Sequence, residues 1–242
     1  VVLPSACFAE KEGTFSNTER RVQRVRKAVE PPGQARTDWE IVADLSSRMG
    51  YAMKYDSAKQ IMDEVNTLAP SYAGITYDRI EKTGLQWPCP TKDHPGTRFL
   101  HKDRFSRGLG LFAAIEFVPP AELPDKKFPL ILSTGRVLYH YHTGTMTRQA
   151  EGPMQRYPQS LVEIHPKDAE KYGIGEGQTV KVTSRRGAVE AKAVVTERSQ
   201  EGTIFMNFHF KETAVNQITN PALDPIGKIP EYKVCAVKVE AV

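Results

Sequence analysis

A short polar stretch after an apolar run carries most of the side chains that could bind a ligand. Residues 133–149 read STGRVLYHYHTGTMTRQ, and residues 129–132 before them read PLIL. Guanidinium, imidazole, hydroxyl and backbone amide groups donate hydrogen bonds, so the stretch favours a phosphate or a polar heterocycle as its ligand. Its candidate binding residues are Thr134, Gly135, Arg136, His140, His142, Thr143 and Thr145.

Two of these residues, His140 and His142, could instead serve a metal ion. On a strand, residues two apart share a face, so both imidazoles would point at one ligand. Two histidines fall short of a zinc site, and no third ligand is near them in the sequence. A polar strand end with partly exposed histidines is the structural alternative.

Three further polar segments contain candidate binding residues. Residues 10–24 include Gly13, which permits close approach of the backbone, and Asn17, which can bond an amide-bearing ring. Asn216 lies in residues 207–225, a polar segment that follows a strand pattern. Lys233 lies at the start of the next strand pattern, in residues 231–240. The structural alternatives are a solvated basic loop, an ordinary turn and a solvated strand end.

The sequence contains no motif for a complete catalytic centre. The patterns GxSxG, HExxH, GxGxxG and the Walker A loop are all missing. No segment combines a nucleophile, a base and an orienting group. We therefore interpret the chain as a binder of an anionic heterocycle, without catalytic or metal-binding residues of its own.

Composition sets the broad class of the protein. The chain has 242 residues, 40% hydrophobic and 26% charged, as in globular proteins, and its net charge of +4 does not imply nucleic acid. Cys7, Cys89 and Cys235 form no CxxC pair, so neither zinc nor an iron–sulfur cluster is expected on this chain. Their odd number suits a reducing compartment and predicts a cytoplasmic protein, and no apolar run is long enough for a transmembrane segment.

The first half of the chain predicts two helices and a linker. Helical spacing indicates helices over residues 38–50, with Asp38 as N-cap, and over residues 59–68. The proline-rich segment at residues 118–128 is the expected linker. Residues 1–3 resemble the end of a buried strand, which suggests that the chain starts inside a larger fold.

The second half predicts a barrel. After the expected short helix from Pro166 to its C-cap Gly173, residues 184–187 read as a hairpin turn with exposed arginines. Many short strands with one small helix indicate a closed barrel, so the predicted fold is a partial α/β layer followed by six strands. The alternating, β-branched segments are residues 130–133, 161–164, 179–184, 188–196, 203–207 and 234–240.

Several motifs in the same order resemble the C-terminal part of the catalytic subunits of molybdopterin-dependent formate dehydrogenases. Residues 1–41 resemble the end of the molybdopterin oxidoreductase region, and GLQWPCPTKDHPGTRFLH, at residues 84–101, is typical of the formate branch. STGRVLYHYHTGTMTR, IHPKDAEKYGIGEGQTVKVTSRRG and ALDPIGKIPEYKVCAVKVE resemble the dinucleotide-binding domain. The resemblance covers essentially the whole chain.

The resemblance implies a fold, a ligand and partners. It divides the chain into residues 1–124, the end of the oxidoreductase region plus linker, and residues 125–242, a double-psi β-barrel. It implies bis(molybdopterin guanine dinucleotide) with molybdenum or tungsten, held in part by residues 134–145, with Asn216 and Lys233 on the cofactor side.

The family's [4Fe-4S] cluster and metal ligand would lie on the remainder of the catalytic subunit, and iron–sulfur electron-transfer subunits would be further partners. Formate and CO2 would be the substrates. We therefore expect that this chain alone is not catalytically competent.

Three alternatives remain open at this stage. A relative such as nitrate reductase would use the same cofactor on another substrate, although residues 84–101 favour formate. A separate cofactor-carrying module would bind the dinucleotide without catalysis. An RNA-binding barrel is the third alternative, and it would call for aromatic stacking motifs on a basic strand face, which the sequence lacks.

Overall fold

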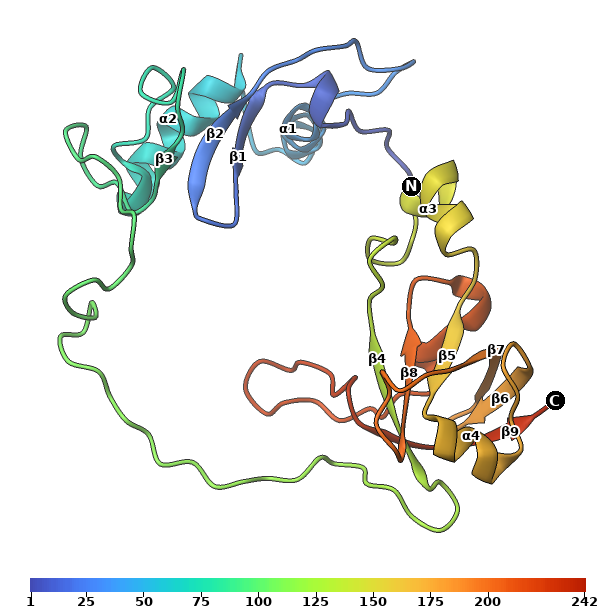
Figure 1. Ribbon diagram of the computed structural model, residues 1–242. Coiled ribbons are helices and arrows are strands. Elements are labelled where there is room, and N and C mark those ends of the chain that lie inside the picture. Colours follow the sequence, from blue (N-terminus) through green and yellow to red (C-terminus); the bar gives the residue numbers. More distant parts are fainter. The chain divides into compact units, whose positions relative to one another are not determined.

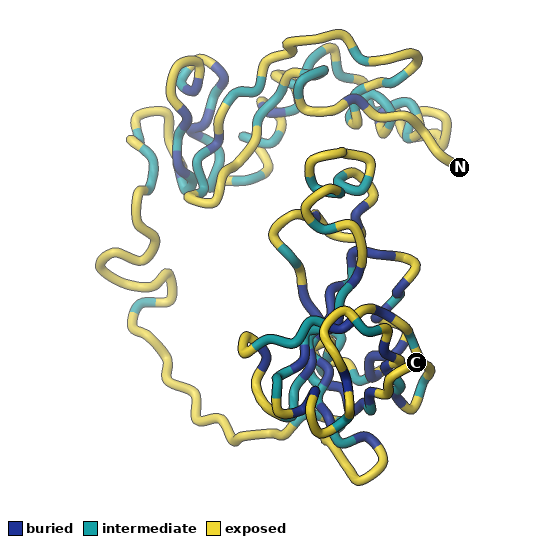
Figure 2. The backbone as a smooth tube through the Cα atoms, turned by 45° about the vertical axis from the view of Figure 1, so that its right-hand side comes forward, coloured by how far each residue is buried: buried dark blue, intermediate teal, exposed yellow.

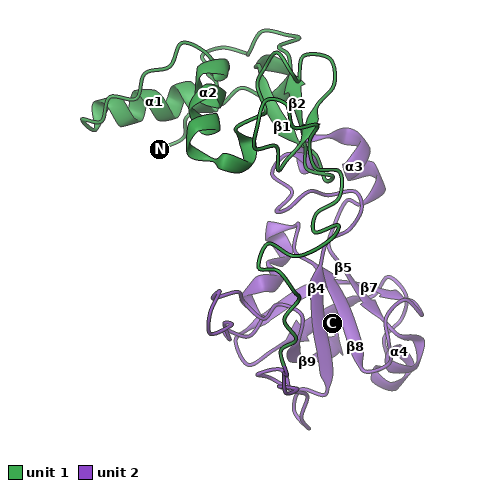
Figure 3. Ribbon diagram, turned by 90° about the vertical axis from the view of Figure 1, so that its left-hand side faces the viewer, with its two compact units in different colours: residues 1–113 green, residues 114–242 purple.

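The computed structural model describes residues 1–242, which divide into two compact units (Figure 3). Unit 1 comprises residues 1–113 and unit 2 comprises residues 114–242. The resemblance placed a boundary at residue 124, within the proline-rich segment before the first strand of unit 2. No helix of the chain has both the length and the apolar character needed to cross a membrane.

Unit 1 contains a small antiparallel sheet and two helices (Figure 1). The central strand β2 pairs with both neighbours, and Val22 on it is buried against Met62 of α2. Cys89 lies in the same small core and is fully buried. The elements are η1 (Phe8–Glu10), β1 (Gly13–Ser16), β2 (Arg21–Val25), α1 (Asp38–Arg48), α2 (Ala58–Leu68), η2 (Pro70–Tyr72) and β3 (Leu85–Gln86).

Both helices expected in the first half are present, but the N-cap of α1 was predicted wrongly. The cap is Thr37, and Asp38 is the first helical residue. Glu40 accepts hydrogen bonds from the Thr37 backbone N–H at 3.0 Å and from its hydroxyl at 2.7 Å. The Glu40 carboxylate, three residues after Thr37, thus satisfies the free backbone N–H at the start of the helix. This capping box favours Thr37 over Asp38 as the N-cap.

The expectation of a buried strand at residues 1–3 is wrong for this chain. Val1, Val2 and Leu3 are exposed and lie outside regular structure. A strand needs a neighbour to pair its backbone N–H and C=O groups, and no strand of unit 1 pairs with these residues.

Unit 2 is the closed six-stranded barrel that the strand pattern predicted, and it agrees with the double-psi barrel that the resemblance implies. Its strand order is β4-β8-β5-β7-β6-β9, and β9 pairs with β4 to close it. The pairs β4–β8 and β5–β7 are parallel, and the other pairs are antiparallel. The strands are β4 (Leu130–Gly135), β5 (Leu161–Ile164), β6 (Thr179–Thr183), β7 (Ala188–Val195), β8 (Thr203–Asn207) and β9 (Cys235–Ala241).

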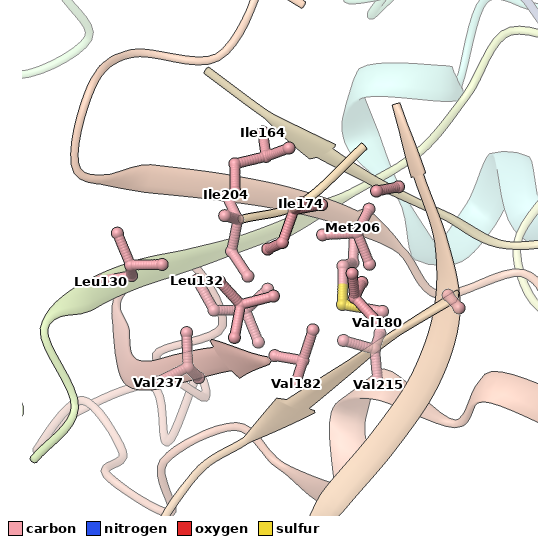
Figure 4. Packing of buried hydrophobic residues seen from close by; sticks show 14 of the residues in the cluster. Leu130, Leu132, Ile164, Ile174, Val180, Val182, Ile204, Met206, Val215 and Val237 are labelled. Carbon is pink, nitrogen blue, oxygen red and sulfur yellow. The ribbon is translucent and has the colours of Figure 1, made fainter. Parts of the chain in front are cut away.

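Alternation along the strands builds the barrel core (Figure 4). Leu130 and Leu132 of β4 point inward with Ile164 of β5 and Ile204 of β8, and each is at most 1% exposed. Successive side chains of a strand point to opposite faces, so burial alternates from Leu130 to Thr134 of β4. Figure 2 shows the buried segments of the barrel in dark blue. Cys235 is also fully buried in this core.

Five short helices complete unit 2. Helix α4 (Pro166–Tyr172) begins with proline and ends at Gly173, whose φ of 65° is the left-handed conformation that favours glycine, as predicted. Helix α3 (Glu151–Arg156) was not expected from the sequence EGPMQR. Pro153 lies in its first turn, where no N–H is needed for an intrahelical bond. The others are η3 (Thr147–Gln149), η4 (Lys211–Thr213) and η5 (Val215–Gln217).

The proline-rich segment before β4 is fastened to the barrel by ionic contacts. Glu122 accepts hydrogen bonds from Arg186 at 2.6 and 3.0 Å and from the Ala236 backbone N–H at 2.7 Å. The hairpin at residues 184–187 is confirmed by a 2.9 Å bond from Ser184 N to Gly187 O. Its Arg186 is half-buried against Glu122, so the prediction of two exposed arginines holds only for Arg185.

Leu132→Ala should destabilise the barrel strongly, because it removes buried methyl groups at a fully buried position. We expect a loss of about 2–5 kcal/mol in the free energy of unfolding. Hydrogen exchange of the β4 and β8 amides measures this loss for unit 2 by itself. Ile226→Ala, at a side chain that is 92% exposed, is the matched control and should leave the exchange unchanged. Equal effects of the two variants would contradict the core assignment.

Candidate functional site

The candidate site of unit 2 lies where β4 ends, because most of the predicted residues follow that strand. β4 ends at Gly135, and we call residues 136–145 the β4 loop. Parallel pairing sets Gly135 opposite Asn207, so the loop and the segment after β8 leave the barrel at the same edge. Of the other predicted residues, Asn216 and Lys233 belong to unit 2, whereas Gly13 and Asn17 belong to unit 1.

The end of β4 is tied to Lys233. The Thr134 hydroxyl is buried and donates to Tyr232 O at 2.9 Å, while Lys233 Nζ donates to Thr134 O. An ammonium has three donors, so this one bond leaves two of them and the positive charge for a ligand. The structure therefore brings Thr134, Gly135 and Lys233 together, although about 100 residues separate them in the sequence.

His140 serves the loop itself. It is 5% exposed, Nε2 donates to Tyr157 O at 2.7 Å, and Nδ1 lies 3.0 Å from the Thr147 hydroxyl. In the neutral ring with its hydrogen on Nε2, Nδ1 accepts from this hydroxyl, which itself accepts from Tyr141 N at 3.2 Å. Both ring nitrogens thus have protein partners, and His140 links the β4 loop to Thr147 and Tyr157.

The expectation that His140 and His142 share one face of a strand is wrong. Residues 137–144 form turns, in which His140 is buried and His142 is exposed. His142 has a φ of 47°, a left-handed conformation that breaks the alternation of a strand. No group of three or more potential metal ligands is assembled in the chain.

Arg136 presents a free cation at this edge. Its side chain is exposed and lies over the Phe208 ring at 6.0 Å, and it has no hydrogen-bond partner in the chain. A guanidinium offers five N–H donors in a planar fork that matches a phosphate or a carboxylate.

Thr143 and Asn216 line one cavity of about 360 Å³ in unit 2. Its walls also include Lys211 and the aromatic rings of Phe208 and Phe210. The Thr143 and Thr145 hydroxyls lie 3.2 Å apart, within hydrogen-bonding distance. A cavity with an aromatic wall, hydroxyl and amide groups and a lysine suits a polar ring that carries negative charge.

Sequence reasoning gave no role to His209, which the structure places directly under the β4 loop. Its imidazole is fully buried, accepts from Val137 N at 2.9 Å and donates from Nδ1 to His142 O. Burial is the main cause that lowers the pKa of His209, the hydrogen bond to His142 O opposes this shift, and the nearby His140 and Arg136 lower the pKa further. The sequence signal was a histidine between two phenylalanines directly after a strand.

Gly13 and Asn17 form part of the β1–β2 hairpin of unit 1. Asn17 Oδ1 accepts from Glu19 N at 3.0 Å and from Arg21 N at 2.9 Å, so it closes the turn. Gly13 is extended, with a φ of 158°. The arginines of this segment are engaged within the unit, for example Arg24 with Glu81 at 2.8 Å. The structure thus gives Asn17 a structural role as a turn residue.

Comparison with known proteins identifies the two parts of the chain. Residues 130–236 match the model of the Molydopterin dinucleotide binding domain, and residues 1–48 match that of Molybdopterin oxidoreductase. Two separate parts of the chain thus match models of molybdopterin proteins. The match over residues 130–236 supports a molybdopterin cofactor for this part of the chain.

Two curated relatives match the chain over nearly its whole length. The F420-dependent formate dehydrogenase subunit alpha of Methanocaldococcus jannaschii is 50% identical over 246 residues, which is 100% of this chain and 37% of the relative. The assimilatory nitrate reductase catalytic subunit of Bacillus subtilis is 38% identical over 253 residues, 99% of this chain and 35% of the relative. The chain therefore spans a little over a third of these relatives.

A solved structure has the same fold. Acetylene hydratase from Pelobacter acetylenicus matches with a TM-score of 0.71 at 18% identity, over 100% of this chain and 38% of that protein.

The residues at the β4 edge fit an anionic dinucleotide. Arg136 and Lys211 carry positive charge there, and Lys233 keeps donors to spare. A Cβ built on Gly135 would lie 3.7 Å from Lys233 Nζ and 2.6 Å from the Phe205 ring, so the close packing at this edge leaves space for glycine only.

Gly135→Ala should therefore destabilise unit 2, because the new methyl group overlaps the Phe205 ring. We expect a loss of about 1–3 kcal/mol in the free energy of unfolding, as for other overpacked sites. Gly152→Ala, where a Cβ meets nothing within 4 Å, is the control and should be neutral or stabilising. Thermal denaturation compares the two, and a Gly135→Ala variant as stable as the control would contradict the close packing.

Proposed function

We propose that this chain is the C-terminal part of the catalytic subunit of a molybdopterin-dependent formate dehydrogenase, with the barrel enclosing part of bis(molybdopterin guanine dinucleotide). The supporting observation is the 50% identity, along the whole chain, to a protein named formate dehydrogenase subunit alpha. The nitrate reductase relative is 38% identical, and nitrate reduction is therefore the second candidate.

We assign the cofactor contacts to side chains that keep hydrogen-bond donors available. Arg136, Thr143, Thr145, Asn216 and Lys233 would contact the pyrophosphate and pterin, because their side chains keep donors available at the open edge of the barrel. When bound, the cofactor's molybdenum or tungsten supplies the two-electron oxidation of formate to CO2.

Other side chains hold this edge in place. Thr134 and His140 are buried and bonded within the chain, so they position the neighbouring donors. Gly135 packs closely against the Phe205 ring, and His142 contributes its backbone carbonyl to the loop contact with His209. Gly13 and Asn17 belong to a hairpin of unit 1, and we propose that this hairpin approaches the same cofactor.

The remaining parts of the enzyme are also part of this proposal. The metal ligand and a [4Fe-4S] cluster would reside on the remainder of the catalytic subunit, and iron–sulfur subunits would carry electrons away. The three unpaired cysteines suit a reducing compartment, so a cytoplasmic location is proposed. This chain by itself would then lack formate dehydrogenase activity.

The function is tested with the catalytic subunit that contains this chain. Purified from its source, it should contain stoichiometric molybdenum or tungsten and reduce a viologen dye with formate as donor. Dye oxidation by nitrate, without formate activity, would replace the proposal with the second candidate. A metal-free, dye-inactive protein that still binds the isolated dinucleotide would support a cofactor-carrying module instead.

Arg136→Ala in the same catalytic subunit should weaken cofactor binding. Loss of a charge-assisted hydrogen bond costs about 1.5–3 kcal/mol, which is on the order of tenfold to a hundredfold in affinity. The readout is metal bound per protein after dialysis against a chelator. Arg198→Ala is the control, since this arginine is exposed and pairs with Glu163 at 2.9 Å on the barrel surface. Equal metal retention by both variants would remove Arg136 from the site.

A further inference from the structure

The imidazole of His209 connects two points of the β4 loop. It accepts a hydrogen bond from Val137 N at 2.9 Å, near the start of the loop, and donates one to His142 O, near its end. The side chain is fully buried, so water does not replace these partners.

These two contacts require one form of the ring. A carbonyl oxygen only accepts, so Nδ1 carries a hydrogen; a backbone N–H only donates, so Nε2 carries none. The neutral imidazole with its hydrogen on Nδ1 is the single form that makes both bonds. Both the imidazolium ion and the other neutral tautomer would point an N–H group at Val137 N–H.

The chain around His209 fits closely against the same loop. Phe208 N donates to Gly135 O at 3.3 Å, before the loop begins. A Cβ built on Gly144 would lie 2.7 Å from His209 O, so the loop returns to this segment with space for glycine only. His142, between these points, has a φ of 47°. The conformation of the β4 loop therefore depends on the segment at residues 207–210.

We propose that His209 is a positioning residue for the ligand-binding β4 loop, which it holds in shape only as a neutral imidazole and releases when protonated. Through Val137 and His142 it sets where Arg136 and Thr143 stand. The assignment of the loop to cofactor binding rests on the proposed function, whereas the contact between His209 and the loop does not.

The surroundings of His209 determine the direction of its pH dependence. The titratable groups that face it are His140, with ring centroids 5.7 Å apart, His142 and Arg136. Burial is the largest cause and lowers the pKa of His209, the hydrogen bond to His142 O opposes this shift, and these three groups lower the pKa further. The unfolded histidine has a pKa of about 6.5, so the unfolded loop binds the proton more readily. The contribution to loop stability is complete above about pH 6.5 and is lost as the pH falls toward the lower pKa of the folded state.

Hydrogen exchange on the 242-residue chain tests the proposal without any cofactor. Protection factors of the Val137 and Gly144 amides, corrected for intrinsic rates, are compared between about pH 7.5 and pH 5. We expect a fall of about tenfold on acidification in the wild-type chain, with the β8 amides unchanged. In His209→Gln, whose amide oxygen can accept from Val137 N but does not titrate, the protection should be the same at both pH values.

Two controls separate titration of His209 from general acid effects. His101→Gln removes an exposed histidine of unit 1 and should keep the wild-type fall. If His209→Gln does not fold, the ¹⁵N shifts of His209 in the wild-type chain decide, since the neutral form with hydrogen on Nδ1 has distinct shifts. Any one of three results would overturn the proposal. The wild-type protection could be independent of pH, or His209→Gln could keep the full acid-dependent fall in protection. The ¹⁵N shifts could also show the other neutral tautomer of His209.

The outcome is independent of the proposed function. Loss of the acid-dependent protection would refute the role of His209 even if the catalytic subunit oxidises formate. Conversely, a catalytic subunit without formate activity would leave the contact of His209 with the loop intact.

Discussion

The parallel pairing of β4 with β8 is the constraint on which the candidate site depends. Because parallel strands end at the same edge, Gly135 lies opposite Asn207, and the two following segments leave the barrel side by side. The segment after β8 then supplies His209 beneath the loop and Phe208 beneath Arg136. If β8 paired one residue out of register, these contacts would be lost, since every side chain would change face.

The polar residues at this edge perform two different tasks. Thr134 and His140 are buried, and their hydrogen bonds are used within the chain. Arg136 and Thr143 are exposed and leave donors available. A donor-rich sequence therefore does not separate polar groups that bond within the chain from those that stay available, because a loop needs polar groups to satisfy its own backbone.

The barrel was predictable from the sequence because its signal is local. Alternation marks each strand, so the bounds of β5 and β8 agree with the structure residue for residue. Proline and glycine mark α4 in the same way. The wrong expectations concern features that depend on partners: the strand at residues 1–3 finds no pairing neighbour, and the cap of α1 is decided by Glu40.

The polar residues of the candidate site were recognisable in the sequence, but their contacts within the chain were not. Arg136 and its neighbours stand out in the sequence, and the match over residues 130–236 supports a molybdopterin cofactor for this part of the chain. The strand parity that placed His140 and His142 on one face failed because the chain turns after Gly135. His209 went unassigned since its partners, Val137 and His142, lie about 70 residues away in the sequence and meet it only through the barrel.

The central claim is that the edge at the end of β4 holds the dinucleotide. The most direct test is an experimental structure of the cofactor-loaded catalytic subunit that contains this chain. We predict pyrophosphate or pterin atoms within about 2.7–3.2 Å of donors on Arg136 and Thr143, with His209 still bonded to Val137 N. A bound dinucleotide that makes no contact with residues 134–145 would contradict it.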